Sequence, residues 1–209
     1  MITIENVEVY GWEAAIRGMR NPMNSWGKSD SWNLTTGYII GSADHELAMK
    51  LVKGGSVHAK FRRMITVTMD ITAPLYWWKE FDTYKVGTVR NSCSTMHKIH
   101  AKEFELDDFS HEHLVQECKY HLESTVRHLN TLRNNYLESK DKLWWWQMIQ
   151  LLPSSYNQRA TVQLNYEVLA NIYKWRKDHK LDEWREFCKC VETLPYAELI
   201  TGGSDGSET

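Results

Sequence analysis

Hydrophobic and polar residues alternate most clearly between Met64 and Thr72. The apolar side chains of this stretch fall on one face and the polar ones on the other, which predicts a β-strand with one buried face. The apolar set is Ile65, Val67, Met69 and Ile71, and the polar set is Thr66, Thr68, Asp70 and Thr72. A weaker alternation over residues 2–9, with a slip near Asn6, predicts a second strand. Residues 86–93 indicate a β-like or irregular segment.

Apolar residues recur every three or four positions over much of the remaining chain, which predicts helices. The longest helix is expected to follow a cap at Asp108 or Ser110, and its stripe is Leu114, Cys118, Leu122, Val126, Leu129, Leu132 and Tyr136. A shorter helix is expected to begin at an Asp44 cap. Residues 21–41 predict a long ordered loop. Other helices are predicted over 11–20, 75–84, 143–152, 155–175 and 181–191.

These elements predict an α+β, helix-dominated fold. The length of 209 residues suits one core, so we expect a single domain over residues 1–201 and a flexible polar tail over 202–209. The net charge of −2 gives no general attraction to nucleic acid or anionic membrane. The N-terminal residues lack a secretory leader and no apolar run approaches a membrane span, so a cytoplasmic location is expected.

The four cysteines show no zinc-ligand spacing, and we expect reduced thiols and no metal site. The ten tryptophans and ten tyrosines favour an oligomer, because aromatic residues are enriched at interfaces. The Trp144–Trp146 run covers too much of a helix to face one core alone. We therefore expect it to be shared between the core and a subunit interface.

The clearest candidate for a ligand-binding site is the stretch 165–176, which follows Leu152 and Pro153 at a short distance along the sequence. On a helix, this stretch would present the amides of Asn165 and Asn171 and the guanidinium of Arg176. Such groups suit a polar ligand that carries phosphate. Taken alone, the same residues are also compatible with an ordinary exposed helix whose last turn carries a cation.

This stretch resembles the ligand-binding helix of the flavin-dependent thymidylate synthase (ThyX) family. From Lys60 to Pro195, about two thirds of the chain, the order of features is similar: a strand into Ala73-Pro74, a helix, a signature turn, a long helix, Leu-Pro and the Asn-Asn-Arg helix. The resemblance implies a ThyX-like fold with a small antiparallel sheet. It also implies FAD as cofactor, a nucleotide ligand and a homotetramer with binding pockets between subunits.

The signature of that family, Arg-His-Arg followed after two residues by Ser, falls on Thr83, Tyr84, Lys85 and Thr88. A later signature Arg that holds the nucleotide falls on Thr95, and an acidic flavin contact falls near Arg63. Losing several arginines would weaken phosphate binding by roughly 1.5–3 kcal/mol each. Nearby cations could replace them. The candidate ligand-binding residues are therefore Arg176, Asn171, Asn165, Lys85, Thr88, Arg90, Tyr84 and Arg63.

Three functions are compatible with this pattern. The first is a divergent ThyX-like protein that binds a nucleotide or nucleotide-derived ligand between subunits without making dTMP by the family's usual route. The second is a flavin-dependent enzyme that modifies a nucleotide, by dUMP methylation or a related reaction. The third is a structural or interaction protein without a small ligand. The sequence identifies no catalytic residue, so it leaves open whether the protein is an enzyme.

Overall fold

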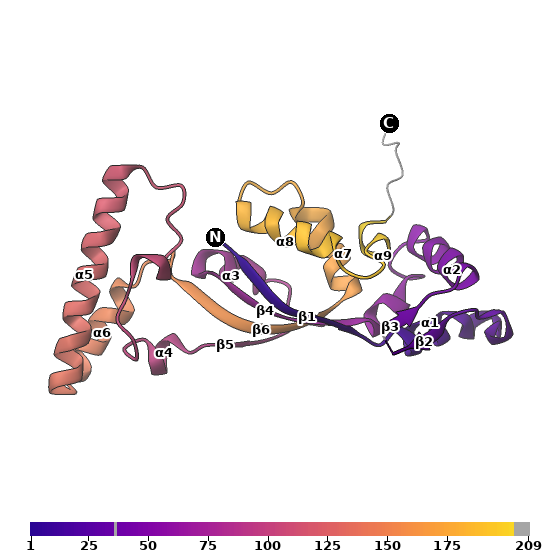
Figure 1. Ribbon diagram of the computed structural model, residues 1–209, viewed down its shortest axis with the longest axis horizontal. Helices are drawn as coiled ribbons and strands as arrows, with labels where there is room; N and C mark the ends of the chain where they lie inside the picture. The colour runs from indigo at the N-terminus through magenta and orange to yellow at the C-terminus, as the bar shows by residue number, and fades with distance from the viewer. Residues whose placement is uncertain (36, 203–209) are drawn as a thin grey trace. The chain divides into compact units, whose positions relative to one another are not determined.

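The computed structural model describes residues 1–35 and 37–202 (Figure 1). Four strands form the main sheet, in the order β1-β4-β6-β5, and two short strands form a hairpin. The main strands are β1 (Thr3–Tyr10), β4 (Thr66–Pro74), β5 (Val89–Ser92) and β6 (Asn157–Asn165), and the hairpin strands are β2 (Trp32–Leu34) and β3 (Gly37–Ile39). The fold is α+β with a small antiparallel sheet, as expected.

Helices account for most of the remaining described residues. The α-helices are α1 (Trp12–Arg20), α2 (Ser42–Lys53), α3 (Leu75–Phe81), α4 (Thr95–Lys98), α5 (Gln116–Ser139), α6 (Lys142–Leu151), α7 (Tyr166–Arg176), α8 (Asp182–Glu192) and α9 (Glu198–Thr201). Four 3-10 helices complete this set: η1 (Asn21–Met23), η2 (Trp26–Lys28), η3 (Lys60–Met64) and η4 (Leu106–Asp108). No helix among the described residues combines the length and hydrophobicity that a membrane span requires.

The chain divides into two compact units. The first consists of residues 1–3, 71–83 and 91–161, and the second consists of 4–70, 84–90 and 162 onward. All four strands of the main sheet contribute residues to both. A single domain over residues 1–201 stays a prediction, and the predicted tail lies outside the described residues except for Gly202.

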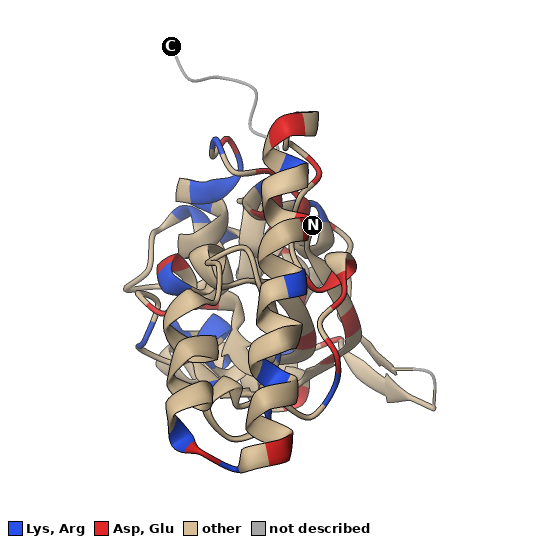
Figure 2. Cartoon of the chain, turned by 90° about the vertical axis from the view of Figure 1, so that its left-hand side faces the viewer, with Lys and Arg blue, Asp and Glu red and all other residues tan. Residues whose placement is uncertain are grey.

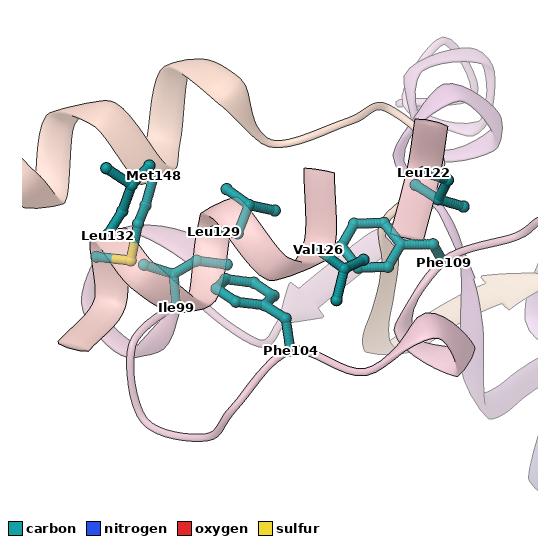
Figure 3. Packing of buried hydrophobic residues seen from close by; sticks show 8 residues of the cluster. All are labelled: Ile99, Phe104, Phe109, Leu122, Val126, Leu129, Leu132 and Met148. Carbon is teal, nitrogen blue, oxygen red and sulfur yellow. The ribbon is translucent and has the colours of Figure 1, made fainter. Parts of the chain in front are cut away.

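The core of the first unit lies between α5, α6 and the segment that precedes α5 (Figure 3). Its buried members are Ile99, Phe104, Phe109, Leu122, Val126, Leu129, Leu132 and Met148. The Oδ1 of Asn130 accepts from the N–H of Phe104 and its Nδ2 donates to the carbonyl of Phe104, each at 2.8 Å, so both backbone polar groups of Phe104 are satisfied at the edge of this core.

The predicted stripe of α5 is confirmed at Leu122, Val126, Leu129 and Leu132, which are buried, and at Tyr136, which packs against them. It is wrong at Leu114, which precedes the helix and is 41% exposed, and at Cys118, which is exposed.

The core of the second unit collects aromatic residues from α1, from α7 and from the segment that follows α8. Trp12 makes edge contacts with Tyr166 and Tyr196 at ring-centroid distances of 5.3 and 5.2 Å. The backbone N–H of Tyr166 donates to the carbonyl of Ile65 at 3.0 Å, which joins the start of α7 to the start of β4. Burial alternates along β4 as predicted, with Val67, Met69, Ile71 and Ala73 buried.

Several predicted elements and caps are wrong. Residues 157–165 form β6 and not helix, because buried side chains alternate there with exposed ones at a period of two. Helix α5 begins at Gln116, after Val115, and neither Asp108 nor Ser110 caps it. Residues predicted as one loop, 21–41, contain the hairpin and two 3-10 turns.

Asp44 does not cap α2, which begins two residues earlier at Ser42. Its N-terminal N–H groups are capped from outside the helix by Asp30, which accepts from the backbone of Ala43 at 2.9 Å and of Asp44 at 3.0 Å. The buried carboxylate of Asp44 instead accepts from Arg20 Nε at 2.5 Å and from Ser31 Oγ at 2.6 Å. Asp30 therefore takes the capping role that the sequence suggested for Asp44, and both carboxylates hold the loop to the start of α2.

Candidate functional site

The candidate site centres on α7, whose first turn is set by Asn165. Asn165 ends β6, and its side-chain oxygen accepts from the N–H groups of Glu167 at 3.1 Å and Val168 at 3.0 Å. This is an N-cap, which satisfies two of the donors that a helix start leaves open. Asn165 is therefore a structural cap at the strand–helix junction, and its oxygen is occupied by the backbone.

Arg176 ends α7 and lies between two aromatic rings. Its Nε donates to the hydroxyl of Tyr84 at 2.9 Å, and its guanidinium carbon lies 4.7 Å from the ring centre of Trp184 and 5.7 Å from that of Tyr84. The two rings contact edge to face, with their centres 5.9 Å apart. An arginine stacked in this way has lost much of its conformational freedom before any ligand binds.

The segment from Tyr84 to Arg90 is attached to α7 at a second point. Gly87 has φ of +76°, and a Cβ built on it would lie 2.9 Å from the amide nitrogen of Asn165. Tyr84 contacts Arg176 at the end of α7, and Gly87 contacts Asn165, the residue that caps its start. The structure thus brings the segment that matches the ThyX signature alongside the helix that carries Arg176.

The other predicted ligand residues in this segment are less closely grouped. The side chain of Lys85 is exposed, whereas Thr88 and Arg90 are half-buried. The hydroxyl of Thr88 is buried and has no hydrogen-bond partner among the described residues. A buried hydroxyl without a partner is costly, so this atom is suited to a ligand or a water. Arg63 lies on η3, outside this segment, and its side chain is exposed.

Asn171 does not share a helix face with Arg176. The two residues are five apart, which places them about 140° apart around the helix and about 7.5 Å apart along it. Asn171 is exposed, while the guanidinium of Arg176 faces Tyr84 and Trp184. A ligand held by Arg176 would therefore reach Asn171 only by extending around α7.

Flavin binding can be tested against the donors that are present. Where the resemblance implies Arg-His-Arg, the chain offers Thr83, Tyr84 and Lys85, of which only Lys85 is a cation. The hydroxyl of Tyr84 is engaged with Arg176. A flavin pyrophosphate requires several cationic or N–H partners. These three residues do not supply them, so they do not fit a flavin pyrophosphate.

One residue of the site, Trp184, was not predicted as a functional residue. In the sequence it belongs to the apolar face of the helix predicted over 181–191, and it is fully buried. Its ring contacts the rings of His179, at 6.4 Å between centroids, and Phe187, at 5.9 Å. Local pattern could identify it only as a core residue, because its contact with Arg176 depends on how α7 and α8 pack.

A surface hollow of about 550 Å³ lies elsewhere in the second unit, between the end of β1, the start of α1 and the β2–β3 hairpin. Its lining includes Tyr10, Trp12, Arg17, Asn33 and Tyr38. None of the predicted ligand residues lines it. The hollow and the predicted site are therefore separate features of this unit.

The cysteines provide no second candidate centre. Cys93 and Cys118 are exposed free thiols, and Cys188 is buried. Burial raises the pKa of the Cys188 thiol to about 12, so this thiol stays protonated at neutral pH. Within residues 1–35 and 37–202, no three His, Cys, Asp or Glu side chains gather as a metal site would require.

Comparison of the fold with solved structures gives matches along nearly the whole chain. A Helicobacter pylori ThyX structure with FAD and dUMP matches with a TM-score of 0.72 and 17% identity, covering 95% of this chain and 96% of that one. A second H. pylori ThyX structure with the same ligands gives 0.67 and 19%, covering 93% and 96%. The UMP/dUMP methylase PolB of Streptomyces cacaoi, bound with 5-Br dUMP, gives 0.62 and 16%, covering 97% and 93%.

At the level of sequence, no protein-family model and no curated protein matches the chain. Identities of 16–19% establish the fold alone. The ligands named above are those of the similar proteins.

Proposed function

We propose that this protein binds a nucleotide or nucleotide-derived ligand on its ThyX-like scaffold, and that it does not make dTMP by the usual route of that family. The observation that carries the proposal is the contact between Arg176 and Tyr84, 92 residues apart in the chain. It joins the two segments that the resemblance singled out. A fixed guanidinium beside aromatic rings suits the anionic or carbonyl groups of a nucleotide.

The substitutions in the signature segment argue against the usual chemistry. Only one cation, Lys85, remains where three basic residues are implied, and Thr95 replaces an arginine that is implied to hold nucleotide. The partners proposed with this function are a nucleotide and further copies of the chain, as a homotetramer with pockets between subunits. A cytoplasmic location belongs to the same proposal.

The first experiment is to purify the protein and record its absorption spectrum, then heat it and identify any released nucleotide by chromatography. A colourless protein that releases a nucleotide supports the proposal. Calorimetry with dUMP and UMP then measures binding directly. Failure of both nucleotides to bind, together with a preparation free of any nucleotide, would contradict it.

The second candidate is a flavin-dependent enzyme that modifies a nucleotide, by dUMP methylation or a related reaction. It is favoured by likeness to structures with FAD and dUMP and to a UMP/dUMP methylase, each over more than nine tenths of both chains. A yellow preparation with a flavin band, and growth of a thymidine-requiring strain that carries the gene, would establish it in place of the first proposal. The third candidate, an interaction protein without a small ligand, is the outcome if neither flavin nor nucleotide binds.

A further inference from the structure

Helix α1 begins with backbone N–H groups that no side chain caps. The residue before the helix is Gly11, with φ of +90°, and it has no side chain that could accept a hydrogen bond. The structure records no acceptor for the N–H groups of Trp12, Glu13 and Ala14 among the described residues. The start of a helix normally satisfies these donors with a side chain, water or a ligand, and it attracts negative charge.

The surface hollow of about 550 Å³ is formed around this helix start. Its lining includes Tyr10 and Gly11 from the end of β1 and the following turn, and Trp12, Glu13 and Ala14 from the first turn of α1. The volume lies within the range of roughly 300–1,000 Å³ that small-molecule sites occupy. The uncapped donors are therefore accessible to a molecule in the hollow.

The indole N–H of Trp12 is a further donor without a partner. Trp12 is only 8% exposed, and the structure records no acceptor for its Nε1 among the described residues. Nε1 is not one of the fully enclosed polar atoms that lack a partner, so it reaches open space, and Trp12 lines the hollow. The Trp12 ring also contacts that of Tyr196, whose hydroxyl accepts from the N–H of Ile40, next to β3, at 2.8 Å. The indole thus lies toward the hairpin that bounds the hollow.

The charges around the hollow nearly cancel. Glu13 and Arg17 both line it, are both exposed, and lie one helical turn apart with 4.0 Å between the carboxylate and the guanidinium. Asn33 of the hairpin donates to the same carboxylate at 3.3 Å. Strands β2 and β3 carry no charged side chain, and the hairpin is drawn without blue or red in Figure 2. The remaining field is that of the helix start, about half a positive charge, which suits a ligand with one negative charge.

The remaining walls of the hollow are largely apolar. Tyr10 is 52% exposed, Leu34 is 50% exposed and Tyr38 is half-buried, and all three line the hollow. Aromatic and aliphatic faces of this kind bind a flat apolar ring. A ligand that matches both parts of the hollow has a ring as its body and one anionic oxygen group for the donors of α1.

We propose that this hollow is a binding site for a small aromatic carboxylate. The carboxylate accepts from the first N–H groups of α1 and from the indole of Trp12, Arg17 supplies the nearby cation, and the ring lies against Tyr10 and Tyr38. A phosphate ester offers similar oxygens but carries about −1.5 to −2 charges at neutral pH, which the carboxylate of Glu13 disfavours. The hollow is separate from the Arg176 site, so the inference does not depend on nucleotide binding.

The first test titrates the ligand-free protein with benzoate and follows its N–H resonances by NMR. The missing signal in the spectrum of Trp12→Phe identifies the indole N–H of Trp12. Benzoate at roughly millimolar concentration should shift this signal and the backbone signals of Glu13 and Ala14 saturably. Benzylamine, which has the same ring and a positive charge, should not shift them. Absence of a saturable shift with benzoate, or equal shifts with benzylamine, would overturn the proposal.

The second test measures benzoate affinity in variants. Arg17→Ala should weaken binding about three- to five-fold, because it removes an exposed charged partner. Lys50→Ala is the matched control, since it removes an exposed cation of α2 that does not line the hollow, and it should bind like the wild type. Trp12→Phe should weaken binding about three-fold, because the ring stays and the donor is lost.

Two results of this second test would count against the site. An equal loss in Arg17→Ala and Lys50→Ala would show that binding depends only on general charge. A loss in Arg176→Ala, with none in Arg17→Ala, would place benzoate in the proposed nucleotide site and overturn the assignment to the hollow. If Trp12→Phe fails to fold, Arg17→Ala decides the question, because position 17 is exposed.

The third test addresses the charge of the ligand with inorganic phosphate as the probe. The wild type should bind phosphate more weakly than benzoate. Glu13→Gln should raise the affinity for phosphate at least three-fold and change that for benzoate less, because it removes the carboxylate that disfavours a second negative charge. A wild type that binds phosphate more tightly than benzoate would overturn the assignment to a carboxylate.

Discussion

Gly87 lies so close to Asn165 that a side chain at position 87 would meet the Asn165 amide. A Cβ there would be 2.9 Å from Nδ2, while the Oδ1 of the same amide caps α7. The turn after Tyr84 and the start of α7 are thus packed against one another. Any change at either residue should be felt at the other.

Gly87→Ala should therefore destabilise the protein by roughly 2 kcal/mol: about 1 kcal/mol for the positive φ and about 1 more for a disturbed cap. Gly55→Ala is the matched control, since Gly55 has φ of +86° with open space around its Cβ position. Gly55→Ala should lose only the roughly 1 kcal/mol of stability that comes from the positive φ. Urea unfolding of both variants measures the difference, and equal losses would mean that the Asn165 cap tolerates the methyl group.

Arg176→Ala should weaken binding of the nucleotide identified by calorimetry by roughly 2–4 kcal/mol, because a charged partner would be left unpaired. Arg176→Lys should recover only part of this, since an ammonium cannot reproduce a planar fork. Tyr84→Phe separates positioning from contact: it removes the 2.9 Å bond to Nε but keeps the ring. It should weaken binding less than Arg176→Ala does. Unchanged affinity in all three variants would remove Arg176 from the binding site.

Asp44→Asn should destabilise the protein by about 3–5 kcal/mol at pH 7, because it leaves the buried Arg20 without its counter-ion. Burial alone would raise the pKa of Asp44, but hydrogen bonds from Ser31, Ser29 and Arg20 outweigh it and lower this pKa. Because the pKa of Asp44 is lower in the folded state, its carboxylate stabilises the fold fully above the pKa of an unfolded Asp, which is near 4. This stabilisation is lost as pH falls through the lowered pKa of the folded state. Urea denaturation of wild type and variant from pH 7 to 3 should show that the difference between their free energies of unfolding becomes smaller as pH falls. A difference that does not depend on pH would contradict the role of this carboxylate.

The thiols should differ in reactivity with a disulfide reagent at pH 8. Cys93 and Cys118 are exposed and should react in the native protein. Cys188 is buried with a pKa raised to about 12, so it should react only after unfolding. Mass spectrometry of labelled peptides assigns each site. Rapid native labelling of Cys188 would indicate that α8 opens readily.

The sequence by itself determined those helices and strands whose apolar residues repeat with a clear period within one continuous segment. The faces of β4 and the buried positions of α5 from Leu122 to Leu132 follow from side-chain periodicity, and the structure agrees with both. The resemblance in residues 60–195 also predicted the ThyX-like fold, although no family model matches the chain. Periodicity is sufficient in these cases because burial on one face is a local property of a helix or strand.

Tertiary structure alone decided the roles that depend on a distant partner. The period-two alternation of residues 157–165 is present in the sequence, but the place of this strand between β4 and β5, and the role of Asn165 as a cap where the strand ends, depend on tertiary structure. Asp30 caps α2 from another segment, so Asp44 is released to bind Arg20. The environment of Arg176 depends on Tyr84 and Trp184, one before α7 and one after it. Sequence spacing does not encode such contacts, because they depend on how separate elements pack.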